Sequence, residues 1–392
     1  MHVFLDHNST TPVLDEVVDC MVECYAHGYG NPASQHAVGR QARRLVEDAR
    51  DCIAGLLGAN LAGRRPDRLI FTSGGTEANN LAILGLAGER QGRLVVSAIE
   101  HPSVLGPAEF LAQRGWQIER ANAEPTGVVG IDRFVELLAG DGPGIAAIIL
   151  GNNETGVLQP VAELARTCHE RGVRLHTDAV QVVGKLPVDF AALGVATLAF
   201  SAHKFHGPRG IGGLVVRGDI ELQPVFYGGF QQGGLRPGTE PVALIVGMQK
   251  ALELWRRDRD QRLQRMTALR DRFEAALRGR VSGLIVNGVD AKRLPHTSNV
   301  SFPGLDRRAL AMALDLDGIA CSTGSACASG SSEPSPVLIA MGLSDEVVAG
   351  SLRFSLGATT SEAEIDTAIE RVVSVVERLG ARNIGNTNCR SR

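Results

Sequence analysis

Val173-Arg174-Leu175-His176-Thr177-Asp178 and Thr197-Leu198-Ala199-Phe200-Ser201 decide the fold class, because each is a short strand-like run that ends on a polar residue. Further runs of this kind lie at Leu69–Thr72, Leu94–Ser97, Ile145–Leu150 and Gly213–Val216. Stretches with apolar residues three and four apart separate several of them, at Glu77–Ala87, Asp132–Leu138 and Val161–Arg171. Strands that alternate with helices predict an α/β fold, with a mostly parallel sheet covered by helices on both faces.

The chain changes character after Pro241. An Arg-rich stretch from Val242 to about Arg278 has alternating charges, which predicts a long helix with a solvated face that bridges two domains. A smaller α/β region follows, with strands at Ser298–Phe302 and Ser351–Ser355, a Gly/Ser-rich loop at Ser322–Ser332, a terminal helix from Ser361 with Glu364 in its first turn, and a frayed polar tail at Asn383–Arg392. We expect a large domain over residues 13–255 and a small domain made of residues 1–12 and 256–392.

Composition excludes several classes of protein. The 392 residues include 40 Lys and Arg against 43 Asp and Glu, so no strong basic field is expected to hold nucleic acid or an anionic membrane. The seven cysteines form no C-x-x-C pair, which argues against a disulfide framework and a cysteine zinc site, and no metal is expected. The N-terminus has no signal-peptide pattern, and the apolar runs are too short to span a membrane. A reducing, cytoplasmic setting is therefore expected.

Chemistry in a parallel sheet is expected beyond the carboxyl ends of its strands. At one such end, Thr72-Ser73-Gly74-Gly75-Thr76-Glu77 joins a strand to a helix. The glycines permit close backbone approach and the helix start favours an anion, so the segment can cradle a phosphate. The same segment also fits a tight turn whose hydroxyl residue caps the helix.

Two further strand ends carry reactive groups. Asp178 follows one strand, where an acid needs a cation or a donor, although it also fits a cap of the next element. Ser201-Ala202-His203-Lys204 follows another and brings a hydroxyl, an imidazole and an amine together. The chain has only four lysines, and Lys185, Lys250 and Lys292 occur in contexts typical of solvated side chains. Lys204 is therefore the predicted imine-forming lysine.

A phosphate cradle, an acid and a lysine at successive strand ends are what a pyridoxal phosphate site requires. The lysine binds the aldehyde, the acid keeps the pyridine nitrogen protonated, and the cradle holds the phosphate. Cys327, inside the Gly/Ser-rich loop, is a candidate nucleophile. Arg353 can clamp a carboxylate, although an ion pair between domains explains it equally well.

The whole set of motifs resembles the cysteine desulfurases of the IscS/NifS type, the long-loop branch of the class V aminotransferases, over nearly the entire chain. The matching stretches are Leu5–Pro12, Gly30–Pro32, Phe71–Asn80, Glu100-His101, Asn152–Gly156, Asp178–Gln181, Ser201–Gly212, Arg236–Thr239, Ser325–Cys327, Glu333–Ser335 and Arg353–Ser355. The resemblance implies the fold of type I pyridoxal-phosphate transferases, with a seven-stranded sheet in the large domain and the catalytic cysteine in the small one.

The resemblance also implies a role for each matching residue. Lys204 would form the imine, Asp178 would bind the pyridine nitrogen, Gln181 would donate to the ring hydroxyl, and His101 would stack on the ring and carry a proton. The phosphate would be held by Gly75, Thr76, Ser201, His203 and a second subunit's Thr239. Asn153 and Arg353 would bind the substrate carboxylate, and Cys327 would accept the sulfur. The chain departs from the family pattern close to Thr239, at Phe230, Gln232 and Pro237.

The implied reaction converts L-cysteine to L-alanine and leaves a persulfide on Cys327. The implied partners are a second copy of the chain and a sulfur-acceptor protein such as an iron–sulfur scaffold. Transamination, selenocysteine lysis and a catalytically silent binding protein are the alternatives. Lys204, Asp178, Cys327 and Arg353 occur together, which argues against a silent protein.

Overall fold

The computed structural model describes residues 2–27, 29–89, 91–139, 144–324 and 333–389, with side chains described as far as residue 381. Its largest sheet has seven strands in the order β2-β8-β7-β6-β5-β3-β4. The strands are β2 (Arg68–Thr72), β3 (Arg93–Ser97), β4 (Gln117–Ala121), β5 (Gly144–Ala147), β6 (Arg174–Asp178), β7 (Thr197–Ser201) and β8 (Gly212–Val216). All neighbours from β4 to β7 pair in parallel, and only the pairs that involve β8 are antiparallel.

Six of these strands match the runs in the sequence, and β4 is the strand that was not predicted. Its residues, Gln117-Ile118-Glu119-Arg120-Ala121, lie at the edge of the sheet and are mostly exposed or half-buried. An edge strand has one solvated side, so it does not need the apolar run that identifies the inner strands.

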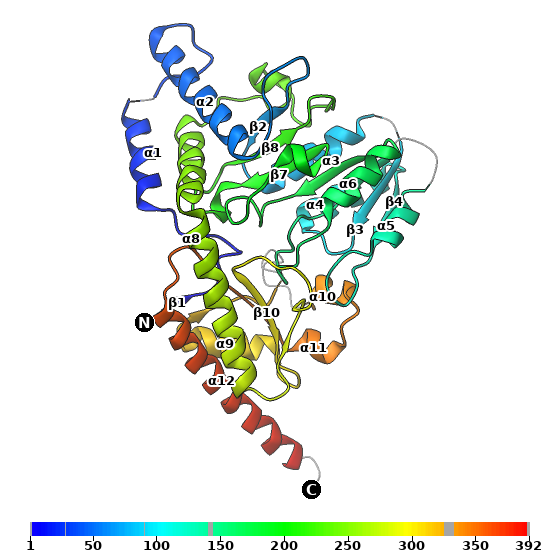
Figure 1. Ribbon diagram of the computed structural model, residues 1–392, viewed down its shortest axis with the longest axis vertical. Helices are drawn as coiled ribbons and strands as arrows, with labels where there is room; N and C mark the ends of the chain where they lie inside the picture. Colours follow the sequence, from blue (N-terminus) through cyan, green and yellow to red (C-terminus); the bar gives the residue numbers. More distant parts are fainter. Residues whose placement is uncertain (1, 28, 90, 140–143, 325–332, 390–392) are drawn as a thin grey trace.

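Helices cover both faces of the sheet (Figure 1). Residues of α3 (Gly75–Ala87) and α4 (Pro102–Gln113) form one buried core against it. Residues of α1 (Asp15–His27), α2 (Ala37–Leu56), α5 (Ile131–Leu137), α6 (Val161–Glu170) and α7 (Phe190–Leu193) contribute to the other core. The predicted layered α/β architecture is therefore observed, and it places the starts of α3 and α4 beside the carboxyl ends of the strands.

The long helix α8 (Val242–Arg280) connects two regions of the fold. Ile245, Met248 and Leu252 belong to the core shared with α1 and α2, whereas Phe273 and Leu277 belong to a separate core with α12. At 1.5 Å per residue, its 39 residues span roughly 58 Å. Figure 1 shows α8 running from beside α1 and α2 down to α12. This is the bridging helix that the sequence predicts.

The second region is smaller and is built on short strands. β9 (Ile285–Val286), β10 (Thr297–Ser301) and β12 (Ser351–Ser355) form an antiparallel sheet, and β1 (Val3–Phe4) pairs in parallel with β11 (Ile319–Ala320). The helices here are α9 (Arg307–Leu316), α10 (Pro336–Ala340), α11 (Asp345–Ala349) and α12 (Glu362–Cys389). The N-terminal segment thus joins the C-terminal third of the chain.

Helix α12 begins with the predicted capping residues. The Ser361 hydroxyl accepts from the Glu364 N–H at 3.2 Å, and a Glu364 carboxylate oxygen accepts from the Ser361 N–H at 2.8 Å. Both bonds satisfy backbone groups at the helix start. The helix continues to Cys389, so the expected fraying from Asn383 is not what the described backbone has.

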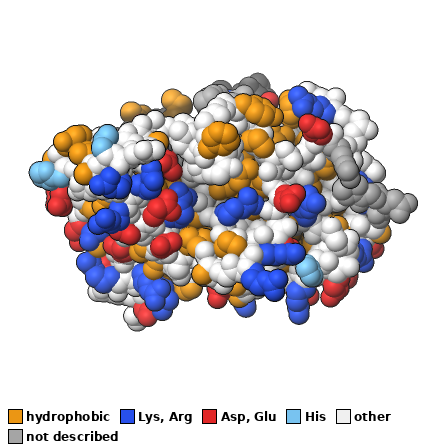
Figure 2. All heavy atoms as spheres, turned by 90° about the horizontal axis from the view of Figure 1, so that it is seen from above, with side chains coloured by type: hydrophobic (Ala, Val, Ile, Leu, Met, Phe, Trp, Pro, Cys, Tyr) orange, Lys and Arg blue, Asp and Glu red, His pale blue; other side chains and the backbone are white. Residues whose placement is uncertain are grey.

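The surface is not divided by charge on the face seen in Figure 2, where basic, acidic and hydrophobic side chains are intermingled. None of the helices in the described part of the chain combines the length and the apolarity that a membrane span requires.

Candidate active site

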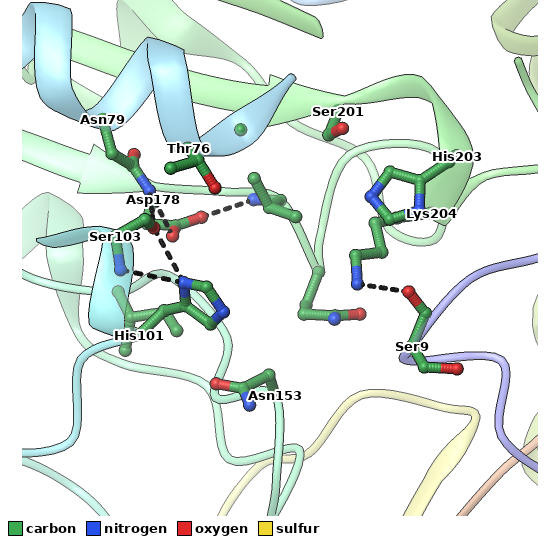
Figure 3. A pocket seen from close by; sticks show the side chains of 14 residues that line it. Ser9, Thr76, Asn79, His101, Ser103, Asn153, Asp178, Ser201, His203 and Lys204 are labelled. Carbon is green, nitrogen blue, oxygen red and sulfur yellow. Dashed lines mark hydrogen bonds between the residues drawn. The ribbon is translucent and has the colours of Figure 1, made fainter. Parts of the chain in front are cut away.

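A pocket of ≈ 250 Å³ opens beyond the carboxyl ends of β6 and β7, next to the start of α3. The predicted site residues that line it are Gly75, Thr76, His101, Asn153, Asp178, Gln181, Ser201, His203 and Lys204. Ser9, Asn79, Ser103, Ile149 and Val180 line it as well and were not predicted. In Figure 3, His101 and Asp178 face the pocket from one side, and His203 and Lys204 from the other.

The predicted cradle lies where α3 begins. The first N–H groups of a helix have no partner within the helix and carry its positive end, so they favour an anion. The Ser201 hydroxyl, buried at the end of β7, has no hydrogen-bond partner in the structure. A Cβ on Gly75 would come within 2.7 Å of a Val180 methyl group, so glycine is what fits against the pocket wall. An anion at this place would satisfy the Ser201 hydroxyl.

Glu77 holds the cradle loop in shape. Its two carboxylate oxygens accept from the Arg236 guanidinium at 2.8 and 3.3 Å, and one accepts from the Ser73 N–H at 2.7 Å. Burial raises the pKa of Glu77, but the hydrogen bonds from Arg236 and Ser73 outweigh it and leave the pKa below its usual range. The carboxylate therefore stays charged, with Ser73 and Arg236 fixed beside it.

Asp178 is buried at the end of β6 and accepts two hydrogen bonds. The Val180 N–H donates to one oxygen at 2.9 Å, and the Asn79 amide donates to the other at 2.8 Å. The bond to Val180 is the capping contact that the sequence left open. The Asn79 amide oxygen in turn lies 3.0 Å from His176 Nε2, and burial lowers the pKa of His176 to about 3. A neutral His176 donates to Asn79 through Nε2 and so turns the Asn79 amide toward Asp178.

His101 is the N-cap of α4, and its ring orientation follows from that place. The Ser103 N–H donates to His101 Nδ1 at 3.1 Å, and the Ser103 hydroxyl lies 2.7 Å from the same nitrogen. A backbone N–H can only donate, so Nδ1 is the acceptor and the proton of the neutral ring is assigned to Nε2. The Ser103 hydroxyl also accepts from Asn79 at 2.8 Å, which connects His101 to Asp178.

Lys204 lies in the 3-10 turn Ala202–Lys204 that follows β7. Its Nζ donates to the carbonyl oxygens of Asn8 at 2.6 Å and Ser9 at 2.8 Å. Burial, followed by the charge of Lys204, lowers the pKa of the neighbouring His203 to about 4, so this ring is neutral at pH 7. Through the carbonyl oxygens of Asn8 and Ser9, the N-terminal segment holds the predicted imine-forming lysine at the edge of the pocket.

Arg353 on β12 is buried and does not line the pocket. One guanidinium nitrogen donates to an Asp6 carboxylate oxygen at 2.7 Å, and another donates to the carbonyl oxygens of Asn153 at 3.0 Å and Gly324 at 3.2 Å. Its Nε has no partner in the structure. Arg353 therefore forms an ion pair, but its partner Asp6 belongs to the same predicted small domain, so this is not the pair between domains that the sequence left open. The ion pair connects β12 to the N-terminal segment.

Cys327 lies outside the described residues, but the chain on both sides of its loop is described. The Ser335 hydroxyl donates to a Glu154 carboxylate oxygen at 2.6 Å. A Cβ on Gly324 would come within 2.6 Å of the same oxygen, and Gly324 has φ +105°, a conformation that favours glycine. Residues 324 and 335 thus meet at Glu154, the neighbour of the pocket residue Asn153.

The five cysteines with described side chains are Cys20, Cys24, Cys52, Cys168 and Cys321, all of them free thiols. Burial raises the pKa of each, to about 11 for Cys52 and to about 12 for Cys168 and Cys321. A thiol with so high a pKa is a poor nucleophile at pH 7. We therefore assign these five cysteines to packing and not to catalysis.

Thr239 is exposed and lies away from the pocket. It borders a separate hollow of ≈ 500 Å³ whose lining includes Glu77, Tyr227 and Arg236. Gln232, one of the departures from the family pattern, accepts from the Phe71 N–H at 2.6 Å and donates to the Phe71 carbonyl at 2.9 Å. Its amide therefore ties the segment before Thr239 to the edge strand β2.

Lys185 corrects one prediction. Its side chain is buried, with a relative exposure of 5%, instead of solvated. Its Nζ donates to Gln181 Oε1 at 2.7 Å, so it belongs to the network behind the pocket. The sequence context gave no sign of this, because burial here results from tertiary packing around the turn that precedes Pro187.

The chain is similar to known proteins over nearly its whole length. The family described as aminotransferase class-V matches residues 3–367. The chain is 40% identical to the cysteine desulfurase IscS of Dictyoglomus turgidum over 380 residues, 96% of this chain and 95% of that protein. It is 37% identical to the cysteine desulfurase NifS of Azotobacter vinelandii over 384 residues, 97% of this chain and 94% of that protein.

Solved structures resemble the fold over nearly its whole length. A NifS-like protein from Rickettsia africae has a TM-score of 0.88 and 30% identity, covering 96% of this chain and 100% of its own. The structure described as SspA in complex with cysteine has a TM-score of 0.79 and 31% identity, covering 92% of this chain and 100% of its own. The α/β fold predicted from the sequence is confirmed.

Proposed function

The chain belongs to the class-V aminotransferase family, among the cysteine desulfurases of the IscS/NifS type, and on that premise we propose that it converts L-cysteine to L-alanine with pyridoxal 5'-phosphate and takes the sulfur onto Cys327 as a persulfide. The resemblance predicted from the sequence is thereby confirmed, and so is the dependence on pyridoxal phosphate that it implies. The roles of individual residues are the proposal.

The residues of the pocket fit pyridoxal phosphate. The buried Ser201 hydroxyl without a partner and the start of α3 offer donors to a phosphate. A buried acid, Asp178, and an amine, Lys204, line the same pocket of ≈ 250 Å³. This convergence of an unpaired phosphate donor, an acid and a lysine at neighbouring strand ends is the observation that carries the proposal.

Gly75, Thr76, Ser201 and His203 would hold the phosphate, Asp178 the pyridine nitrogen, Gln181 the ring hydroxyl, and His101 the face of the ring. When bound, pyridoxal phosphate supplies an aldehyde that captures an amine and a ring that withdraws electrons from the substrate Cα. Asp178 favours a protonated pyridine nitrogen, because two donors fix its carboxylate at the end of β6. The Asn79 amide would thus act on the cofactor indirectly, by orienting the Asp178 carboxylate.

Lys204 would carry the proton that leaves the substrate Cα. Its Nζ donates to two carbonyl oxygens at 2.6 and 2.8 Å. A carbonyl oxygen has no proton to donate, so these contacts orient the amine without exchanging protons with it. His101 would be the second proton carrier, because its Nδ1 is occupied by Ser103 and the ring presents Nε2 as the exchanging atom. Asn153 and Arg353 would bind the substrate carboxylate.

Cys327 would attack the substrate sulfur as a thiolate. The C–S bond of cysteine breaks, an S–S bond forms on Cys327, and the carbon fragment takes up protons and leaves as alanine. The substrate and the Cys327 thiol therefore become alanine and one persulfide, and no external oxidant is needed. The attachment of residues 324 and 335 to Glu154, beside Asn153, supports this role.

We also propose that the enzyme is a homodimer in which Thr239 reaches the phosphate of the partner copy. Phe226, Tyr227 and Phe230 lie within five residues of the sequence and are exposed by 53, 87 and 95% in the single chain, and exposed aromatic side chains are typical of an interface. A solution mass that corresponds to a monomer alone would contradict this.

The persulfide would pass to an acceptor protein, such as an iron–sulfur scaffold, in the reducing cytoplasm. The free state of the five described cysteines is compatible with that compartment. We further propose that residues 13–255 form the large domain and that residues 1–12 and 256–392 form the small one, with α8 spanning both.

The reaction is tested by incubating the pyridoxal-phosphate-loaded enzyme with L-cysteine and a thiol reductant, and by measuring alanine and sulfide. Wild type should release both in equal amounts. The Cys327→Ser variant should retain the cofactor absorbance and release neither, whereas the matched control Cys321→Ser should behave as wild type. Sulfide release by Cys327→Ser at the wild-type rate would contradict the persulfide step.

A further inference from the structure

Lys185 is a buried lysine that the reaction described above does not use. Its relative exposure is 5%, and burial lowers its pKa well below the usual range. The charges of Lys204 and Arg353 lower the pKa further. A lysine buried near other cations costs stability, so its presence calls for a compensating role.

Gly184 brings Lys185 close to the active lysine. Gly184 has φ +73°, and a Cβ at this position would come within 2.3 Å of the Phe205 Cβ. Only glycine permits so close an approach of the two backbones. Since Phe205 follows Lys204 directly in the chain, the turn places Lys185 on the side of the pocket from which Lys204 extends.

The contact of Lys185 is with Gln181, which lines the pocket. Lys185 Nζ donates to Gln181 Oε1 at 2.7 Å, and Gln181 Nε2 donates to the Asn8 carbonyl at 2.9 Å. The same Asn8 carbonyl accepts from Lys204 Nζ at 2.6 Å. A continuous set of hydrogen bonds therefore runs from Lys185 through Gln181 and Asn8 to Lys204.

These partners define the orientation of the Gln181 amide. The Lys185 amine donates to Oε1 whether it is charged or neutral, and a backbone carbonyl only accepts. If the amide of Gln181 turned over, its oxygen would face the carbonyl of Asn8 and would lose the donor that Lys185 supplies. The contact between the two oxygens would then be repulsive. The network leaves one of the two Nε2 protons on Asn8 and the other for a ligand in the pocket.

We propose that Lys185 is a positioning residue that locks the Gln181 amide with its NH₂ group toward the pocket, so that Gln181 donates to an oxygen of the bound pyridoxal phosphate. The inference rests on the proposed function, because Gln181 has a ligand to serve only if the pocket holds this cofactor. Lys185 itself touches neither cofactor nor substrate and acts through Gln181.

The test uses Lys185→Met, which retains the aliphatic stem and removes the donor. The absorption maximum of the bound cofactor should shift, because a hydrogen bond to its oxygen is lost. The dissociation constant for pyridoxal phosphate should rise roughly tenfold, as for a lost hydrogen bond to a charged group. Lys292→Met, which replaces an exposed lysine, is the matched control and should change neither quantity.

A double-mutant cycle separates positioning from general damage to the fold. Gln181→Ala alone should produce the same spectral shift and loss of affinity, and adding Lys185→Met to it should change the affinity by less than about twofold. Additive effects would overturn the inference, since Lys185 would then act by another route. Wild-type absorbance and affinity in Lys185→Met would overturn it as well.

Gln181→Glu tests the same inference if Lys185→Met does not fold. A carboxylate still accepts from Lys185 but has no N–H to donate to Asn8 or to the cofactor, so the spectral shift should appear, and the lost bond to Asn8 should lower the melting temperature. An unshifted spectrum would overturn the inference. Failure of the wild-type protein to bind pyridoxal phosphate at all would instead contradict the proposed function, so the two failures are distinguishable.

Discussion

The two anion-binding regions proposed for this molecule differ in how far their donors are already occupied. At the cradle, the buried Ser201 hydroxyl has no partner, and the start of α3 presents its N–H groups to the pocket. At the arginine region, Arg353 already donates to Asp6, Asn153 and Gly324, and only its Nε lacks a partner. The cradle is prepared for an anion, whereas the arginine region is satisfied within the protein.

This difference suggests two modes of binding. A resident phosphate gains hydrogen bonds that nothing in the protein supplies, which favours a cofactor that stays bound. A substrate carboxylate at Arg353 must compete with Asp6, which favours a ligand that enters and leaves at every turnover. Lys204, which donates to the carbonyl oxygens of Asn8 and Ser9 in the N-terminal segment, would act on both the cofactor and the substrate.

The largest effect is expected when Lys204 is removed, because Lys204 is the proposed carrier of the proton that leaves the substrate Cα. Lys204→Ala should lower kcat about 10²- to 10⁴-fold, the contribution of general acid–base catalysis. Alanine release under saturating cysteine measures it, and Lys292→Ala is the control. A variant within a few-fold of wild type would show that another group carries the proton.

The next largest effect tests the cradle. Ser201→Ala should weaken pyridoxal phosphate binding roughly 10- to 100-fold, the value of a hydrogen bond to a charged group. Ser298 on β10 also has a buried hydroxyl without a partner, and it does not line the pocket, so Ser298→Ala is the matched control. Equal affinities for the two variants would remove the distinction between the cradle and other buried hydroxyls.

A smaller effect tests the competition at Arg353. Asp6→Asn removes the charge that lies 2.7 Å from the guanidinium, so the substrate carboxylate should bind more tightly. We expect KM for cysteine to fall roughly threefold with kcat retained. This change corresponds to a fraction of the free energy of one charge-assisted hydrogen bond. Steady-state kinetics measure this. A higher KM would mean that Asp6 orients Arg353 for the substrate instead of competing with it.

The smallest effect concerns stability behind the pocket. Burial raises the pKa of Glu100 from 4.5 to about 8. Between these two values the unfolded chain loses the proton that the folded chain keeps, so Glu100 costs stability as pH rises from about 4.5 to 8. Glu100→Gln should remove this loss.

Melting temperatures across that window measure the effect, and the difference between wild type and Glu100→Gln should grow by a few degrees toward the upper end. Buried histidines such as His176 change stability in the opposite direction as pH falls, but both proteins share them. A constant difference at all pH values would contradict a raised pKa at Glu100.

The sequence predicted the parts of the fold that depend on local patterns. Short runs ending on Asp178 and Ser201 located two strand ends, and with them Lys204. Two contacts were not predicted, because they join residues far apart in the chain. The Asn79 amide meets Asp178, 99 residues away, and Asp6 meets Arg353 across 347 residues. The prediction that Lys185 is solvated was wrong for the same reason, because nothing in its local sequence indicates burial.

The location of the transferred sulfur is the most direct measurement of all. Enzyme treated with sulfur-labelled L-cysteine, without a reductant, is digested, and the label is assigned to peptides by mass spectrometry. One labelled sulfur on the peptide that contains Cys327, with one alanine formed for each, is the expected result. Alanine formed with no label on Cys327, or label retained in the Cys327→Ser variant, would contradict the proposed persulfide.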